Sequence, residues 1–224
     1  MTVPTPPRFP QPRAQTYVAL DLELEQPSQR VIEVGVVIAR LGSPAGTWLC
    51  RNWLIANEAP LSDFIQGLTG ISQTEMNLHG VPLAQCCDEL STLLANTPDL
   101  HPNAVTWGGG DSTELQAEFK AAGLAFPHFG HRWVDVKTLA TFLRFSQGAL
   151  KPGGLASELK AHKLAFEGRP HRALDDAFNT LRLYFLLLER QAAMEQKHWI
   201  AQHGELAAQR EQAGPRMRQR ASGA

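Results

Sequence analysis

Short apolar runs near the start of the chain predict β-strands. Tyr17–Leu22 has the length and character of a buried strand, and Val31–Leu41 and Thr47–Ile55 resemble it. A turn-forming stretch at Gly42–Gly46 separates the last two segments. Since consecutive strands with short connections usually pair, these three segments are expected to form an antiparallel meander.

Helical periodicity dominates the rest of the chain. Pro82–Ala95 carries its apolar residues on one stripe, which predicts an amphipathic helix. Ala104–Trp107 is expected to be a short strand, and Asp111–Gly123 a helix that has Ser112 or Thr113 as its N-cap. Strands followed by alternating strands and helices indicate an α/β fold with a mixed sheet. Three further segments are expected to be helical: Val134–Phe145, Gly154–His162 and Arg172–Arg190.

The two ends differ from this middle in composition. Residues 1–15 are rich in proline, which predicts a disordered leader, and residues 197–224 are expected to be a basic, flexible tail. The folded domain is therefore expected over residues 16–196. The formal net charge is −1, with basic residues concentrated at both ends. These ends can attract a phosphate backbone, although solvated ends are the commoner explanation of such composition.

Composition excludes several classes of protein. With 224 residues and 43% hydrophobic content, one globular domain is expected. No apolar run approaches the roughly 20 residues that span a bilayer, and no hydrophobic segment of a secretory signal opens the chain. Cys50, Cys86 and Cys87 are odd in number and lack metal-binding spacing, which favours a reducing compartment and a cytoplasmic location.

Acidic residues far apart in the chain lie at the ends of the predicted elements. Asp21 and Glu23 are two residues apart at a strand end, so both side chains point to one face. Asp111 follows a strand and three glycines, and Asp176 lies one turn into a late helix, five residues after His171. Each alone is explained by a polar strand end, a helix cap or a solvated acid.

Together these residues predict a two-metal phosphodiesterase site. Two divalent cations roughly 4 Å apart can activate water and stabilise a leaving oxygen, and Mg²⁺ prefers oxygen ligands such as carboxylates. A histidine side chain changes its protonation near neutral pH, so His171 can accept a proton from water.

The order of these motifs resembles the DEDD superfamily of 3′–5′ exonucleases, in its histidine-containing (DEDDh) group. The match spans Tyr17 to Arg190, and it is most similar to the branch that trims small RNAs and histone mRNA, with KapD-like bacterial relatives. The motifs are Val18–Glu23, Val31–Gly35, Leu68–Ile71, Thr106–Gly108 before Asp111, Trp133–Lys137 and His171–Ala177.

The resemblance implies an RNase-H-like fold, a mixed five-stranded sheet flanked by helices. It also implies hydrolysis of single-stranded nucleic acid from a free 3′ end to nucleoside 5′-monophosphates, with RNA favoured over DNA and no membrane partner. It assigns Asp21, Glu23, Asp111 and Asp176 to two Mg²⁺ or Mn²⁺ ions, with Glu23 and His171 catalytic and His171 the general base. Substrate binding is expected of Leu24, Leu68, Thr69 and Ile71.

Some features leave other interpretations open. Gly109–Gly110 and Leu24–Glu25 depart from the residues usual in the family, which affects the grip on substrate but removes no metal ligand. A catalytically inert RNA-end binding module and an oligoribonuclease-like or proofreading-type exonuclease are the alternatives. Leu68–Ile71 is equally explained as a helix–turn boundary. Four aromatic residues are expected in the core more often than stacked on bases: Trp107, Trp133, Phe142 and Phe145.

Overall fold

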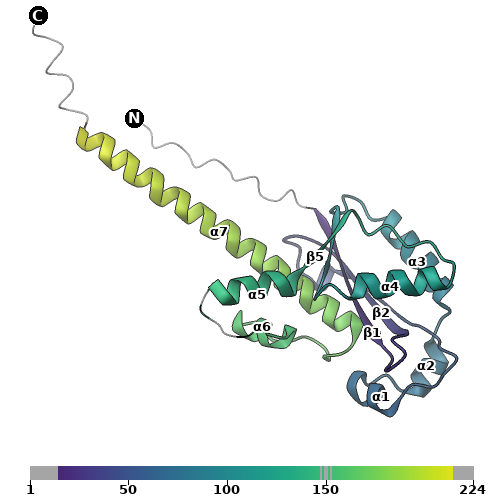
Figure 1. Cartoon of the computed structure of the whole chain (residues 1–224). Coiled ribbons are helices and arrows are strands. Elements are labelled where there is room, and N and C mark those ends of the chain that lie inside the picture. Colours follow the sequence, from purple (N-terminus) through teal and green to yellow (C-terminus); the bar gives the residue numbers. More distant parts are fainter. Residues whose placement is uncertain (1–14, 147, 149–150, 152, 214–224) are drawn as a thin grey trace, which may run out of the picture. The chain divides into compact units, whose positions relative to one another are not determined.

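The computed structural model describes residues 15–146, 148, 151 and 153–213 (Figure 1). Strands come first and then alternate with helices, as the sequence predicts. In chain order the elements are β1 (Thr16–Leu24), β2 (Val31–Arg40), the 3₁₀ turn η1 (Ala45–Thr47), β3 (Leu49–Leu54), α1 (Asp63–Thr69), α2 (Gln73–His79), α3 (Leu83–Ala95), β4 (Asn103–Thr106), α4 (Asp111–Ala121), β5 (Arg132–Asp135), α5 (Val136–Ser146), α6 (Leu155–Ala161) and α7 (Ala173–Ala213).

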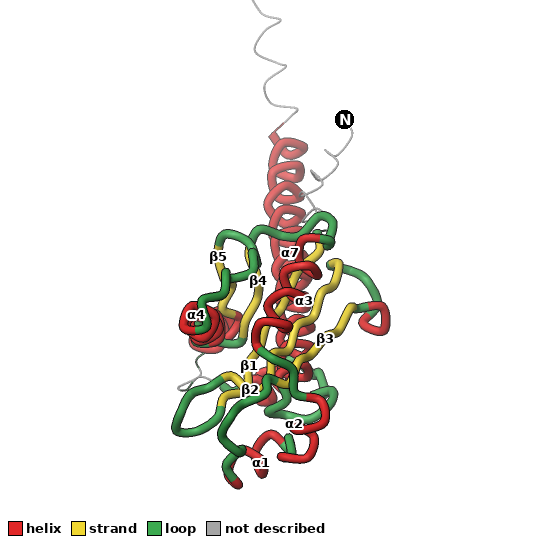
Figure 2. The backbone as a smooth tube through the Cα atoms, turned by 90° about the vertical axis from the view of Figure 1, so that its right-hand side faces the viewer, coloured by secondary structure: helices red, strands yellow, loops and turns green. Residues whose placement is uncertain are grey.

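The five strands form one mixed sheet in the order β3-β2-β1-β4-β5. β1, β2 and β3 form the expected antiparallel meander, whereas β4 pairs parallel with both β1 and β5. Figure 2 shows the strands between α3 in front and α7 behind. The predicted fold class, a five-stranded mixed sheet flanked by helices, is confirmed.

The alternation of side chains along β1 assigns different roles to the two faces of the sheet. Val18, Leu20 and Leu22 point into the core, where α3 and α4 pack against them. Tyr17 belongs to the opposite face, and its ring lies 5.7 Å from that of Tyr184 and 5.4 Å from that of Phe185, both in α7. Asp21 and Glu23 alternate with the core residues and therefore share the α7 face of the sheet.

Several element boundaries differ from the sequence-based expectations. Val134–Phe145 is not one helix, because Arg132–Asp135 forms β5 and the helix begins only at Val136. A strand of four residues is too short for its alternation to be separated from the helix that follows. α4 begins at Asp111 itself after Gly110, so neither Ser112 nor Thr113 is its N-cap.

Two short helices, α1 and α2, were not predicted. Each begins after a serine whose hydroxyl accepts a backbone N–H: Ser62 from Ile65 at 3.3 Å, and Ser72 from Glu75 at 3.0 Å. The cap residues were readable in the sequence, but the seven-residue helices they open are too short to show periodicity.

α7 extends beyond Arg190 to Ala213, into the segment expected to be a flexible tail. Residues 214–224 and residues 1–14 of the expected leader lie outside the described residues. The described chain divides into two compact units between Phe185 and Leu186, within α7. In the unit that begins at Leu186, the side chains of Met194 and Ile200 are exposed. Among the helices of the described residues, none is both long and apolar enough to cross a bilayer.

Candidate active site

The first part of the site lies at the end of β1, where it pairs with β2. In this antiparallel register Asp21 lies opposite Gly35, and Glu23 lies opposite Glu33. A Cβ at Gly35 would overlap the backbone of Ala173 and Leu174. The missing side chain thus lets the first turn of α7 approach the strand that borders Asp21 and Glu23.

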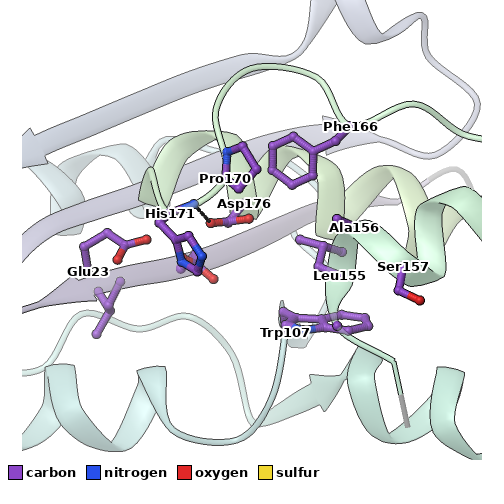
Figure 3. Close-up of a pocket in the computed structure, with 12 residues that line it drawn as sticks. Glu23, Trp107, Leu155, Ala156, Ser157, Phe166, Pro170, His171 and Asp176 are labelled. Atoms are coloured by element: carbon purple, nitrogen blue, oxygen red, sulfur yellow. Dashed lines mark hydrogen bonds between the residues drawn. The ribbon is translucent and has the colours of Figure 1, made fainter. Parts of the chain in front are cut away.

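The second part of the site is the beginning of α7. The backbone N–H of His171 donates to Oδ2 of Asp176 at 2.8 Å, as drawn in Figure 3. Ligand atoms of Glu23, His171 and Asp176 all lie within 4.8 Å of one another. The neighbouring Asp175 has a different partner, because its Oδ2 accepts the backbone N–H of Arg169 at 2.8 Å.

Asp111 reaches the site through a glycine turn after β4. Gly108 has a left-handed φ of 98°, its carbonyl accepts the hydroxyl of Thr106 at 2.7 Å, and its N–H donates to Oδ1 of Asp135 at 3.0 Å. Asp111 then opens α4, where its charge acts on both Asp21 and Asp176. Asp135, which holds this turn, was not singled out from the sequence, although it lies within the Trp133–Lys137 motif.

Burial is the largest cause of raised pKa values among the four acids. It raises the pKa of Glu23 to about 8, that of Asp111 to about 7 and that of Asp176 to about 6. The pKa of Asp21 is well above its ordinary range, through burial and then the charges of Asp111 and Asp176. Four partly buried carboxylates that repel one another favour a proton or a cation among them. This donor set therefore fits a divalent metal ion, which prefers oxygen ligands.

A cavity of about 420 Å³ opens beside these side chains. Figure 3 shows Trp107 across the gap from His171 and Asp176, with the α6 residues Leu155–Ser157 along one side. Asp21 and Glu23 line it as well. The cavity therefore combines the acids with apolar walls wide enough to accept a ring.

A second cavity of about 550 Å³ also includes Glu23. Leu24 and Leu68, both expected to bind substrate, line it together with Phe64, whose side chain is 65% exposed. Phe64 was not among the residues predicted from the sequence, because α1 was not predicted. The cap residue Ser62, two positions earlier, is the signal that could have revealed it.

Thr69 and Ile71, also expected to bind substrate, are fully buried instead. The hydroxyl of Thr69 donates to the carbonyl of Ile65 at 2.8 Å and accepts the N–H of Ile71 at 3.1 Å. Ile71 packs in a core cluster with Ile32. These two residues stabilise the end of α1 and line neither cavity. This arrangement is the one expected if Leu68–Ile71 is a helix–turn boundary.

The four aromatic residues expected in the core divide between three environments. Trp133 packs against Phe129, with ring centroids 5.0 Å apart, whereas Trp107 lines the first cavity. Phe142 and Phe145 are exposed on α5, by 70% and 49%, so the expectation of burial was wrong for both.

No family model matches the chain. Its sequence is similar to human ERI1 exoribonuclease 2, with 29% identity over 188 residues, which are 75% of this chain and 26% of that protein. The mouse protein of the same name is 31% identical over 147 residues, covering 57% of this chain and 21% of that protein. The chain thus spans about a quarter of the length of these relatives.

Solved structures with the same fold include the nuclease domain of 3′hExo, a DEDDh family member, bound to rAMP. It has a TM-score of 0.65 and 20% identity, over 80% of this chain and 94% of that one. E. coli Exonuclease I in complex with a dT13 oligonucleotide has a TM-score of 0.61 and 14% identity, over 82% of this chain and 43% of that one.

The fold is therefore the RNase-H-like fold of DEDDh exonucleases. The resemblance drawn from the sequence is thus supported by similarity to ERI1 exoribonuclease 2 and, in fold, to the nuclease domain of 3′hExo.

Proposed function

We propose that this chain is a metal-dependent 3′–5′ exonuclease that hydrolyses single-stranded nucleic acid, with RNA favoured over DNA. The observation that carries the proposal is the convergence of Glu23, His171 and Asp176, whose ligand atoms lie within 4.8 Å of one another at the wall of a cavity. Similarity to ERI1 exoribonuclease 2 supports the reaction and the RNA preference. Asp21 and Asp111 complete the acidic set.

Asp21, Glu23, Asp111 and Asp176 would hold two Mg²⁺ or Mn²⁺ ions. Such ions, when bound, supply charge stabilisation at the phosphate and lower the pKa of water. His171 accepts the proton of the attacking water as general base. Its backbone is held by the hydrogen bond to Asp176, so the imidazole stays beside Glu23. Attack on the terminal phosphodiester releases a nucleoside 5′-monophosphate.

Leu24, Leu68 and Phe64 would hold the terminal nucleotide in the second cavity. Aromatic and apolar side chains bind single strands by stacking on bases, which tolerates any sequence. Glu23 lines both cavities, so a base held in the second cavity places its phosphate beside the acids in the first. The nuclease domain of 3′hExo was solved with rAMP, a single nucleotide, which supports a terminal-nucleotide site of this size.

The test is a time course on 5′-labelled single-stranded RNA and DNA of matched sequence, with Mg²⁺, Mn²⁺ or EDTA. We expect a metal-dependent ladder that shortens from the 3′ end, faster on RNA, and its loss in Asp21→Ala. Asp88→Ala, an exposed acid on α3, is the matched control and should leave the ladder unchanged. Binding without cleavage would favour the inert end-binding module, and cleavage of dinucleotides alone would favour the oligoribonuclease-like alternative.

A cytoplasmic location belongs to the same proposal. The three cysteines are free, and Cys86 and Cys87 are adjacent and buried, which suits a reducing compartment.

A further inference from the structure

Glu33 is a fully buried carboxylate with an unusually complete set of partners. It accepts hydrogen bonds from Nη2 of Arg172 at 2.9 Å, from Nε of Arg172 at 3.2 Å to each oxygen, and from the backbone N–H of Ala173 at 2.9 Å. The amide of Asn52 adds one more at 3.1 Å. A buried carboxylate that is fully bonded in this way holds its partners in one arrangement.

These partners connect the two halves of the candidate site. Glu33 lies opposite Glu23 in the β1–β2 register, so it is fixed to the strand pair that carries the first acids. Arg172 directly follows His171, and Ala173 is the first residue of α7. One buried side chain therefore sets the position of the α7 start, with His171 and Asp176, relative to β1.

His171 itself has a backbone that needs such support. Its φ is 64°, in the left-handed region that residues with a side chain rarely adopt. A conformation of this kind persists when the surrounding structure holds it on both sides. The carboxylate of Asp176 accepts the N–H of His171, and the carboxylate of Glu33 binds the side chain of Arg172, the next residue.

Arg172 also reaches α2, the helix that follows α1 in the chain. Its Nη2 donates to Oε1 of Glu75 in α2 at 3.2 Å. On the other side of His171, Nη2 of Arg169 lies 3.4 Å from the carbonyl of Gly67 in α1. The loop with His171 is thus tied to α1, which lines the expected nucleotide site, and to α2, as well as to the sheet.

Resting on the proposed function, we propose that Arg172, anchored by Glu33, is a positioning residue that holds His171 in place for proton transfer. Arg172 itself is not among the residues that line either cavity, so the proposed action is on His171 and not on the substrate. A planar guanidinium that bonds both oxygens of a carboxylate fixes direction as well as distance, which a lysine ammonium does not. The role therefore depends on arginine and not only on positive charge.

The experiment measures kcat and KM on single-stranded RNA for Arg172→Gln and Arg172→Lys, each alone and combined with His171→Ala. A misplaced general base should lower kcat by about 10²-fold in Arg172→Gln, with KM changed less than about threefold. Arg172→Lys should fall between this variant and the wild type. Because the effect passes through His171, adding Arg172→Gln to His171→Ala should slow the enzyme by no more than about twofold.

Arg30→Gln is the matched control, since Arg30 also pairs with a glutamate, Glu118, at 2.6 Å, but outside the site. It should keep the wild-type kcat. Thermal unfolding identifies a variant that fails to fold. If Arg172→Gln fails to fold, the inference is tested with Arg172→Lys, which keeps the positive charge and a side chain of similar length. An unchanged kcat in folded Arg172 variants, or the same loss in the wild-type and His171→Ala backgrounds, would overturn the inference alone. An inactive wild type would instead overturn the proposed function.

Discussion

Glu23→Gln is expected to stabilise the metal-free protein at alkaline pH while it removes activity. Burial, followed by the charges of Asp176, Glu33 and Asp111, raises the pKa of Glu23 from 4.5 to about 8. The folded state therefore binds this proton more tightly than the unfolded state. Stability from this group is fully present below about pH 4.5 and is lost as the pH rises through about 8.

The size of the effect follows from the same shift in pKa. Moving a pKa from 4.5 to about 8 corresponds to a stability loss on the order of 5 kcal/mol once the acid is fully ionised. A glutamine has the shape of a protonated glutamate and cannot ionise. Glu23→Gln should thus avoid most of this loss at about pH 8.5 and change stability little at about pH 4.

The assay is urea unfolding in EDTA at about pH 4 and about pH 8.5. Glu58→Gln, which changes an exposed loop acid, is the control and should match the wild type at both values. With Mg²⁺ present, Glu23→Gln should show no exonuclease ladder. A Glu23→Gln protein less stable than the wild type at about pH 8.5, or stabilised equally at both pH values, would refute the reasoning.

His171→Ala should lower kcat by about 10²–10⁴-fold with an unchanged circular dichroism spectrum, because it removes the general base and no core contact. Mg²⁺ at 100 times its Kd should add about 2.7 kcal/mol to the free energy of unfolding of the wild type, and so raise its unfolding temperature in scanning calorimetry. Asp21→Asn should abolish this rise. Gly35→Ala should cost about 1–3 kcal/mol in urea unfolding because its Cβ would overlap α7, whereas a Cβ at Gly46 meets open space and makes Gly46→Ala the control. Phe64→Ala should raise KM for RNA roughly tenfold with a smaller change in kcat, since it removes a stacking surface.

Each of these expectations has a contrary result. A kcat of His171→Ala close to that of the wild type would contradict the role of His171 as general base. An unfolding temperature that does not change with Mg²⁺ would contradict the metal site. Equal stability of Gly35→Ala and Gly46→Ala would contradict the close approach of α7. An unchanged KM in Phe64→Ala would place the nucleotide outside the second cavity.

Local pattern was enough to predict much of the fold. The apolar runs of β1–β3 and the apolar stripe of α3, which recurs every three to four residues, are visible within each segment by itself. Three short elements, β5, α1 and α2, were not found, because four to seven residues show a period only weakly. The same limit hid Phe64, which lies in α1.

By itself, the sequence determined which residues are candidates for the chemistry: acids at element ends and a histidine five positions before the last of them. Only the tertiary structure decided that they meet. Glu23 and Asp176 are brought together by the β1–β2 register and by the close approach of α7 at Gly35, and the buried Glu33 holds that junction. The contacts between β2 and the start of α7 join residues more than a hundred positions apart, and no periodicity along the chain encodes such a distance.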